Sequence, residues 1–243
     1  MFRIVDKREL NSMVTLLEIE APFVAKKAQA GQFIIFRVDE FSERVPLTIA
    51  DYDREKGTVT IIFQKVGLST QMLAAKEIGD TILDFVGPLG VATEYDGMKK
   101  VAVVGDGVGC AIAYPQAKAL HNLGVEVDVI AGFRNKDIVI LEDEFRACSS
   151  KLKLMTDDGT YGEKGLVTDG VNMVQDYTFL YTCGPEAMLK AVYAVCKTSG
   201  QFSFEERMGC GFGACMGCTC KTKYGNKRIC KDGPVQEREE IVW

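Results

Sequence analysis

Four cysteines near the C-terminal end have the residue type and spacing of a redox metal site. They are Cys210, Cys215, Cys218 and Cys230, so four, two and eleven residues separate them. This spacing is typical of a plant-type [2Fe–2S] cluster held by four thiolates. The pattern therefore predicts a protein that transfers single electrons. Glycines alternate with these cysteines and are expected to supply the positive φ angles of a tight loop: Gly209, Gly211, Gly213 and Gly217.

Two other uses of these thiols remain open alternatives. Zinc also binds four thiolates, although structural zinc sites usually combine two short C-x2-4-C arms. Disulfides fit less well, because the nine cysteines are an odd number and the first residues lack the apolar core of a secretory signal. A reducing, cytoplasmic location is therefore expected. Cys220 is a fifth thiol in this region, and we expect it to face away from the cluster.

The composition of the chain argues against two classes of function, nucleic-acid binding and membrane insertion. The chain has 243 residues, of which 47% are hydrophobic, and a formal net charge of −5. The negative charge argues against general nucleic-acid binding. No apolar run approaches the roughly 20 residues that span a bilayer, so no membrane insertion is expected.

The chain is predicted to be an α+β multidomain protein with three parts. Residues 1–97 contain short β-rich runs between turn residues, which indicates an antiparallel barrel. Residues 98–200 alternate strands with helices, which indicates a parallel α/β sheet. Residues 201–243 form a small cysteine-rich subdomain.

A glycine-rich turn in the middle part is a candidate dinucleotide site. Such a turn follows a strand, opens a helix and lets the backbone approach a pyrophosphate. The turn here reads G-x-G-x-G, which is not the usual G-x-G-x-x-G, and Asp106 places an acid beside the expected phosphate. A second loop follows a later apolar strand, and its cysteine is a candidate to approach a nicotinamide ring, although a buried, inert thiol is the commonest role of a free cysteine. The candidate residues of the two loops are Gly105, Gly107, Gly109, Cys183, Gly184 and Pro185.

The barrel offers a candidate diphosphate site. An arginine precedes a strand, and a later strand leads to small residues that open a predicted helix near residues 70–76. By themselves these residues are more typical of a strand, a turn and a helix N-cap than of a diphosphate site. The candidate residues are Arg44, Val45, Pro46, Leu47, Thr48, Ile62, Phe63, Gln64, Gly67, Ser69 and Thr70.

Taken together, these three parts resemble the ferredoxin-reductase superfamily. The tail EERMGCGFGACMGCTCKT…RICKDGP is similar to that of the electron-transfer subunits of dihydroorotate dehydrogenase B. The stretches RVPLTIADYDREKGTVTIIFQ and MTDDGTYGEKG are more similar to the small subunit of NADH-dependent ferredoxin:NADP oxidoreductase, a family that typically has an aspartate as one cluster ligand. The FAD-binding R-P-x-S stretch of the superfamily is replaced here by Val45–Thr48, with Arg44 one place early.

The resemblance implies FAD in the barrel, NAD(H) in the α/β part and a [2Fe–2S] cluster in the tail. It implies a cytoplasmic oxidoreductase subunit that carries electrons between NAD(H) and a catalytic partner with FMN, in the oxidation of dihydroorotate to orotate for pyrimidine biosynthesis. A hetero-oligomer of the α2β2 type is expected. The alternative is the small subunit of an electron-bifurcating NADH-dependent ferredoxin:NADP oxidoreductase with a large flavin and iron–sulfur partner. A zinc-stabilised binding module is a third possibility. The sequence does not decide between NADH and NADPH.

Overall fold

The computed structural model describes residues 1–174 and 176–243, and the chain forms two compact units. The first unit comprises residues 1–93, 206–219 and 228–234, and the second comprises residues 94–205, 220–227 and 235–243. The cysteine-rich tail is thus divided between the two units. The division into segments 1–97, 98–200 and 201–243 stays a prediction.

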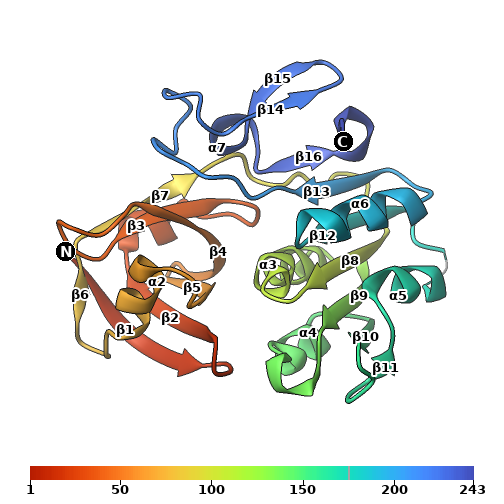
Figure 1. Cartoon of the computed structure of the whole chain (residues 1–243), viewed down its shortest axis with the longest axis horizontal. Coiled ribbons are helices and arrows are strands. Elements are labelled where there is room, and N and C mark those ends of the chain that lie inside the picture. The colour runs from red at the N-terminus through yellow and green to blue at the C-terminus, as the bar shows by residue number, and fades with distance from the viewer. Residues whose placement is uncertain (175) are drawn as a thin grey trace. The chain divides into compact units, whose positions relative to one another are not determined.

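The first unit is built on a nearly closed antiparallel barrel (Figure 1). Its strands follow the order β6-β1-β2-β5-β4-β3-β7. Only Leu83 separates the two edge strands, which explains why the sheet nearly closes. The strands are β1 (Phe2–Glu9), β2 (Val14–Glu20), β3 (Phe33–Arg37), β4 (Val45–Asp53), β5 (Thr58–Gln64), β6 (Thr81–Ile82) and β7 (Asp84–Leu89).

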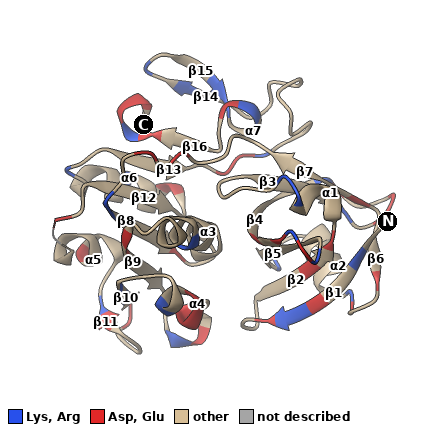
Figure 2. Ribbon diagram, turned by 180° about the vertical axis from the view of Figure 1, so that it is seen from behind, with Lys and Arg blue, Asp and Glu red and all other residues tan. Residues whose placement is uncertain are grey.

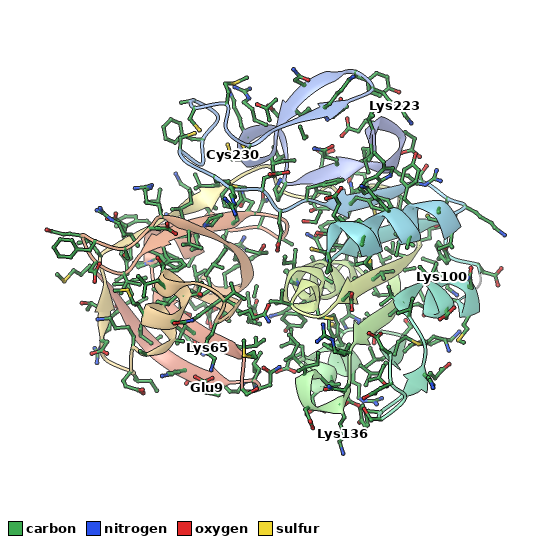
Figure 3. The ribbon with its side chains drawn as sticks, in the orientation of Figure 1. Glu9, Lys65, Lys100, Lys136, Lys223 and Cys230 are labelled. Atoms are coloured by element: carbon green, nitrogen blue, oxygen red, sulfur yellow. The ribbon has the colours of Figure 1, made fainter. Side chains whose placement is uncertain are left out.

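The barrel strands form because alternate apolar side chains point inward. Phe36, Ile61 and Phe63 lie in this core with no more than 1% of each side chain exposed. On the outer surface, Glu9 at the end of β1 and Lys65 just after β5 form an ion pair of 2.9 Å (Figure 3). Two short helices complete the barrel, α1 (Pro22–Ala25) and α2 (Leu68–Ala74), so the helix predicted near residues 70–76 begins two residues earlier.

The second unit contains a mainly parallel sheet in the order β11-β10-β9-β8-β12-β13-β16. All of its pairs are parallel except that of β13 with β16. The predicted α/β architecture is confirmed. The strands are β8 (Lys100–Asp106), β9 (Glu126–Phe133), β10 (Lys151–Thr156), β11 (Glu163–Lys164), β12 (Phe179–Cys183), β13 (Gly200–Ser203) and β16 (Val235–Glu237).

Helices cover both faces of this sheet. The pair α3 (Gly109–Asn122) and α4 (Glu142–Ala147) lies on one face, and α5 (Val167–Met173) and α6 (Glu186–Val195) lie on the other (Figure 1). The short 3-10 helices are η1 (Lys136–Ile138) and η2 (Arg238–Glu240). His121, the single histidine, is exposed near the end of α3.

The tail adds a hairpin of β14 (Thr219–Thr222) and β15 (Gly225–Arg228), followed by the one-turn helix α7 (Ile229–Asp232). None of the helices in residues 1–174 and 176–243 has the length and apolarity that a membrane crossing requires.

Candidate iron–sulfur and nucleotide sites

The four candidate ligand cysteines all belong to the first unit and interact in two pairs. The thiols of Cys210 and Cys215 contact each other, and those of Cys218 and Cys230 form the second pair. The first three residues come from the loop before β14, and Cys230 is brought back by the hairpin on α7, where Figure 3 labels it. One loop therefore carries three of the cysteines, and the hairpin that follows it brings the fourth back to them.

The two pairs differ in their exposure to solvent. Cys215 is exposed and Cys210 is partly exposed, whereas Cys218 and Cys230 are each only 2% exposed. We call the more exposed pair, Cys210 and Cys215, the outer pair, and the buried pair, Cys218 and Cys230, the inner pair.

Backbone N–H groups point at the sulfur atoms. The amides of Ala214 and Cys215 lie 3.2 and 3.4 Å from Cys210 Sγ, and the Cys230 amide lies 3.3 Å from Cys218 Sγ. Such donors stabilise thiolates and tune the potential of a bound metal centre. The amide of Gly217 completes this set at 3.5 Å from Cys215 Sγ.

The glycines of the loop have two different roles. Gly211 and Gly213 adopt φ angles of +80° and +88°, as expected for a tight loop. Gly209 and Gly217 do not, so the prediction of positive φ is wrong for them; instead, a Cβ at either would lie 3.4 or 3.5 Å from Cys215 Sγ. Their missing side chains leave room beside this sulfur. Met216, a non-glycine residue of the same loop, adopts a left-handed conformation, with φ of +62°.

The thiol pKa values follow the same asymmetry. The backbone amide of Cys215, with further donors, lowers the pKa of Cys210 to about 6. Burial, followed by the neighbouring Cys218, raises the pKa of Cys230 to about 12. Cys210 thus reaches the thiolate form more readily than Cys230 does.

This donor set fits a two-iron cluster better than one zinc ion. A tetrahedral zinc site needs four ligands on one ion, whereas the four thiolates of a [2Fe–2S] cluster are shared between two irons. Two pairs of thiols match the second requirement.

Cys220 is not a member of either pair. Its sulfur lies 2.9 Å from Nε2 of Gln236, which donates a hydrogen bond to it. This contact fits the expectation that Cys220 faces away from the cluster.

The candidate dinucleotide loops meet at the switch point of the parallel sheet. The chain runs from β8 outward through β9 and β10, then returns to β12 on the other side of β8. In open α/β sheets, ligands bind at the carboxyl ends of the strands where the order reverses. Gly105, one residue before the end of β8, lies directly opposite Cys183, which ends β12.

Missing side chains let these two loops pack together. A Cβ on Gly109 would lie 2.5 Å from the carbonyl oxygen of Cys183 and 2.8 Å from Cα of Gly184. Gly107 differs, because its φ is +55° and a Cβ there would meet no atom within 4 Å. The N-terminus of α3 carries no side-chain cap. The turn therefore offers open space and uncapped N–H groups, which suits a phosphate.

Three acidic residues lie near these loops, and only Asp106 of the three was singled out from the sequence. Burial, together with the Asp157 carboxylate, raises the pKa of Asp106 to about 6. Burial also raises the pKa of the Cys183 thiol well above its usual value, and the carboxylate of Glu205 adds to this shift. Asp157 and Glu205 each follow within two residues of a strand's carboxyl end, and this position was the signal that would have identified them.

The candidate flavin residues gather at one end of the barrel. The start of β4 lies beside the end of β5, because the two strands are antiparallel with Ile49 opposite Ile61. The amide of Glu43 donates to the hydroxyl of Ser69 at 3.1 Å, which holds α2 against the residue before Arg44.

Several of these side chains already have partners within the protein. The Thr70 hydroxyl accepts from the amide of Gly67 at 3.0 Å, so it caps α2. The guanidinium of Arg44 lies 3.9 Å from a carboxylate oxygen of Asp84. Ile62 and Phe63 are buried, with 6% and 1% exposed. The assignment of these residues to FAD stays a prediction.

The comparisons with known proteins agree with this site. Residues 205–242 match the model of the iron–sulfur cluster binding domain of dihydroorotate dehydrogenase B. An uncharacterized protein in the adh 3' region of Clostridium beijerinckii is 44% identical, over 96% of this chain and 84% of its own length. A dihydroorotate dehydrogenase B (NAD(+)) electron transfer subunit homolog of Thermotoga maritima is 38% identical, over 99% of this chain and 87% of its own length.

A solved structure extends the similarity to the fold. A chain from work on flavin-based electron bifurcation in the NADH-dependent reduced ferredoxin-NADP oxidoreductase superposes with a TM-score of 0.94 and 36% identity. The match covers 100% of this chain and 90% of the other. Because relatives up to 38% identical across nearly their whole length bear that name, the chain belongs to the family of dihydroorotate dehydrogenase B electron transfer subunits.

Proposed function

We propose that this chain is the electron-transfer subunit of a flavin and iron–sulfur oxidoreductase that exchanges electrons with NAD(H). The observation that carries the proposal is the arrangement of four cysteines as two thiol pairs, with backbone amides directed at three of the sulfurs. FAD in the barrel would supply two-electron chemistry, and a [2Fe–2S] cluster would supply one-electron chemistry. The protein's own contribution is to bind and orient these groups.

Each unit provides one part of this function. In the second unit, Gly107 and the N-terminus of α3 would hold the pyrophosphate of NAD(H), while Cys183 and Glu205 lie at the adjoining strand ends. In the first unit, the loop from Cys210 to Cys218 and the helix α7 would hold the cluster. The partner would be a catalytic subunit that carries FMN and oxidises dihydroorotate to orotate, in an α2β2 assembly. The free thiols favour a reducing compartment, and we include the cytoplasm in the proposal on that basis.

A second function is favoured by one observation, the TM-score of 0.94 with the bifurcating oxidoreductase chain. In that case the partner would be a large flavin and iron–sulfur subunit, and the product would be reduced ferredoxin or NADPH.

One experiment separates these functions. The chain is purified from its native host with whatever subunit it binds, and its iron, acid-labile sulfide, flavin and zinc contents are measured. We expect iron, sulfide and FAD. The complex is then assayed for dihydroorotate-dependent NAD+ reduction and for NADPH-dependent reduction of ferredoxin with NAD+. Activity only in the second assay would favour the bifurcating function, and a colourless zinc protein would contradict both.

A further inference from the structure

Arg228 occupies a special position between the two arms of the cysteine site. It is the last residue of β15 and directly precedes α7, which carries Cys230. Its Nε donates to Asp232 Oδ2 at 3.0 Å, and its Nη2 lies 3.4 Å from Asp232 Oδ1. The side chain is 26% exposed, so it lies against the protein rather than in free solvent.

The same guanidinium also reaches the cysteine loop. Its Nη1 donates to the carbonyl oxygen of Gly213 at 3.0 Å. Gly213 lies between Cys210 and Cys215, and a Cβ there would come within 3.3 Å of this nitrogen. One planar side chain therefore links the loop of the outer thiol pair to the helix of the inner pair. A simple surface ion pair between residues i and i+4 would not include this third contact.

Arg228 also places a positive charge near the inner thiols. It lies two residues before Cys230 in the sequence, and its Nη1 contacts the Gly213 carbonyl oxygen within the cysteine loop. Four thiolates around a cluster carry net negative charge, and reduction adds one more negative charge. A nearby fixed cation stabilises the reduced form more than the oxidised form, and it therefore raises the reduction potential.

We propose that Arg228 is a positioning residue that ties the cysteine loop to α7 and raises the reduction potential of the centre that these cysteines hold. This inference rests on the proposed function, because it requires a cluster at this site. Arginine suits both tasks, since its planar fork makes several directed hydrogen bonds and keeps its charge at every physiological pH.

The test uses the full chain with its partner and compares Arg228→Gln, Arg228→Lys and a control, Lys221→Gln. Lys221 is an exposed lysine of β14, so the control removes one positive charge from the same tail. The midpoint potential is measured by redox titration of the cluster's absorbance and EPR signal. The rate of iron release to a chelator is measured separately.

We expect Arg228→Gln to have a more negative midpoint potential than both wild type and the control. We expect Arg228→Lys to keep a potential near wild type, because the charge remains. Both Arg228 variants should release iron about tenfold faster, since outer-shell hydrogen bonds of metal sites have effects of that size.

Two results would each overturn one part of this proposal. A Gln variant with the control's potential would overturn the charge role. Wild-type iron release in both Arg228 variants would overturn the tethering role. If Arg228→Gln does not fold, the iron release of Arg228→Lys still decides the tether, and its potential in rising salt decides the charge role. Wild-type protein without iron would instead contradict the proposed function itself.

Discussion

At the scale of single residues, Asp106 shows how burial opposes ionisation. Its carboxyl lies partly buried at the end of β8, and its pKa of about 6 exceeds the usual 3.8. Between these values the folded chain binds more protons than the unfolded chain, so the free energy of unfolding decreases as pH rises from about 4 to about 6. Above about pH 6 the buried Asp106 carboxylate is ionised, and its full destabilising effect on the folded chain is present.

Asp106→Asn is therefore expected to stabilise the protein in a pH-dependent way. The gain at pH 7.5 should be about 1–2 kcal/mol, after reducing the full value of about 1.4 kcal/mol per pKa unit because the carboxyl is partly exposed. At about pH 4 the gain should nearly vanish, because the wild-type carboxyl is then largely protonated in the folded chain. Denaturant unfolding at both pH values measures the effect. Asp96→Asn, at an exposed turn, is the control, and an equal gain for it would contradict the explanation.

Cys215 and Cys220 allow a second prediction at this scale. Cys215→Ser should abolish the visible absorbance of the iron–sulfur centre, because it removes one sulfur of the outer pair. Cys220→Ser should retain that absorbance, since this sulfur is hydrogen-bonded to Gln236. Visible and EPR spectra of the purified variants provide the readout. Bleaching by Cys220→Ser combined with an intact spectrum in Cys215→Ser would disprove the ligand assignment.

At the scale of elements, two glycines of the turn between β8 and α3 have different roles, one in packing and the other in ligand binding. Gly109→Ala would force a Cβ to within 2.5 Å of the Cys183 carbonyl oxygen, so it should destabilise the protein by roughly 1–3 kcal/mol. Gly107→Ala meets no neighbour and should cost only about 1 kcal/mol for its φ of +55°. Its methyl group would nevertheless occupy the space where we expect the pyrophosphate.

We therefore expect Gly107→Ala to weaken NADH binding more than it lowers thermal stability, and Gly109→Ala to do the reverse. NADH titration and thermal unfolding of both variants provide the comparison. FAD content should stay at the wild-type level in both. Unchanged NADH affinity in Gly107→Ala would place the dinucleotide elsewhere.

Elements with strong local signals were predictable from the sequence, and others were not. The β-rich runs expected within residues 1–97 do form strands, and the glycine turn does join a strand to a helix. β1 escaped prediction because its sequence, FRIVDKRE, exposes charged residues between few buried ones. β10 contains two lysines for the same reason. The spacing of the cysteines identified the candidate ligands, but their pairing and the contact of Arg228 with Gly213 depend on the folded loop.

At the scale of the whole molecule, the tail belongs to both units. Glu206–Thr219 and Arg228–Pro234 belong to the first, and Cys220–Lys227 and Val235–Trp243 belong to the second. Basic residues of the tail on β14 and β15 are blue in Figure 2. Lys223 donates to the Glu239 carbonyl oxygen and Lys227 pairs with Glu240, so these two lysines hold the tail within the second unit.

The C-terminal residues complete the second unit's sheet and core. β16 pairs with β13, so its removal would expose an unpaired edge strand. Ile241 is 3% exposed in the core, and the ring of Trp243 packs edge-on against Tyr193 and Phe202. A segment that ends at residue 200 lacks all of these contacts and β13 itself.

A fragment of residues 98–200 is therefore expected to aggregate or to unfold without cooperativity, although it contains both candidate NAD(H) loops. A fragment of residues 94–243 retains every strand of the sheet and is the matched control. We expect it to be the more soluble of the two, with a sharper thermal transition and measurable NADH binding. Size-exclusion chromatography, near-ultraviolet circular dichroism and NADH titration test the comparison. A monomeric 98–200 fragment with a cooperative transition and the control's NADH affinity would show that the nucleotide part folds without the tail. The division at residue 200 would then be correct.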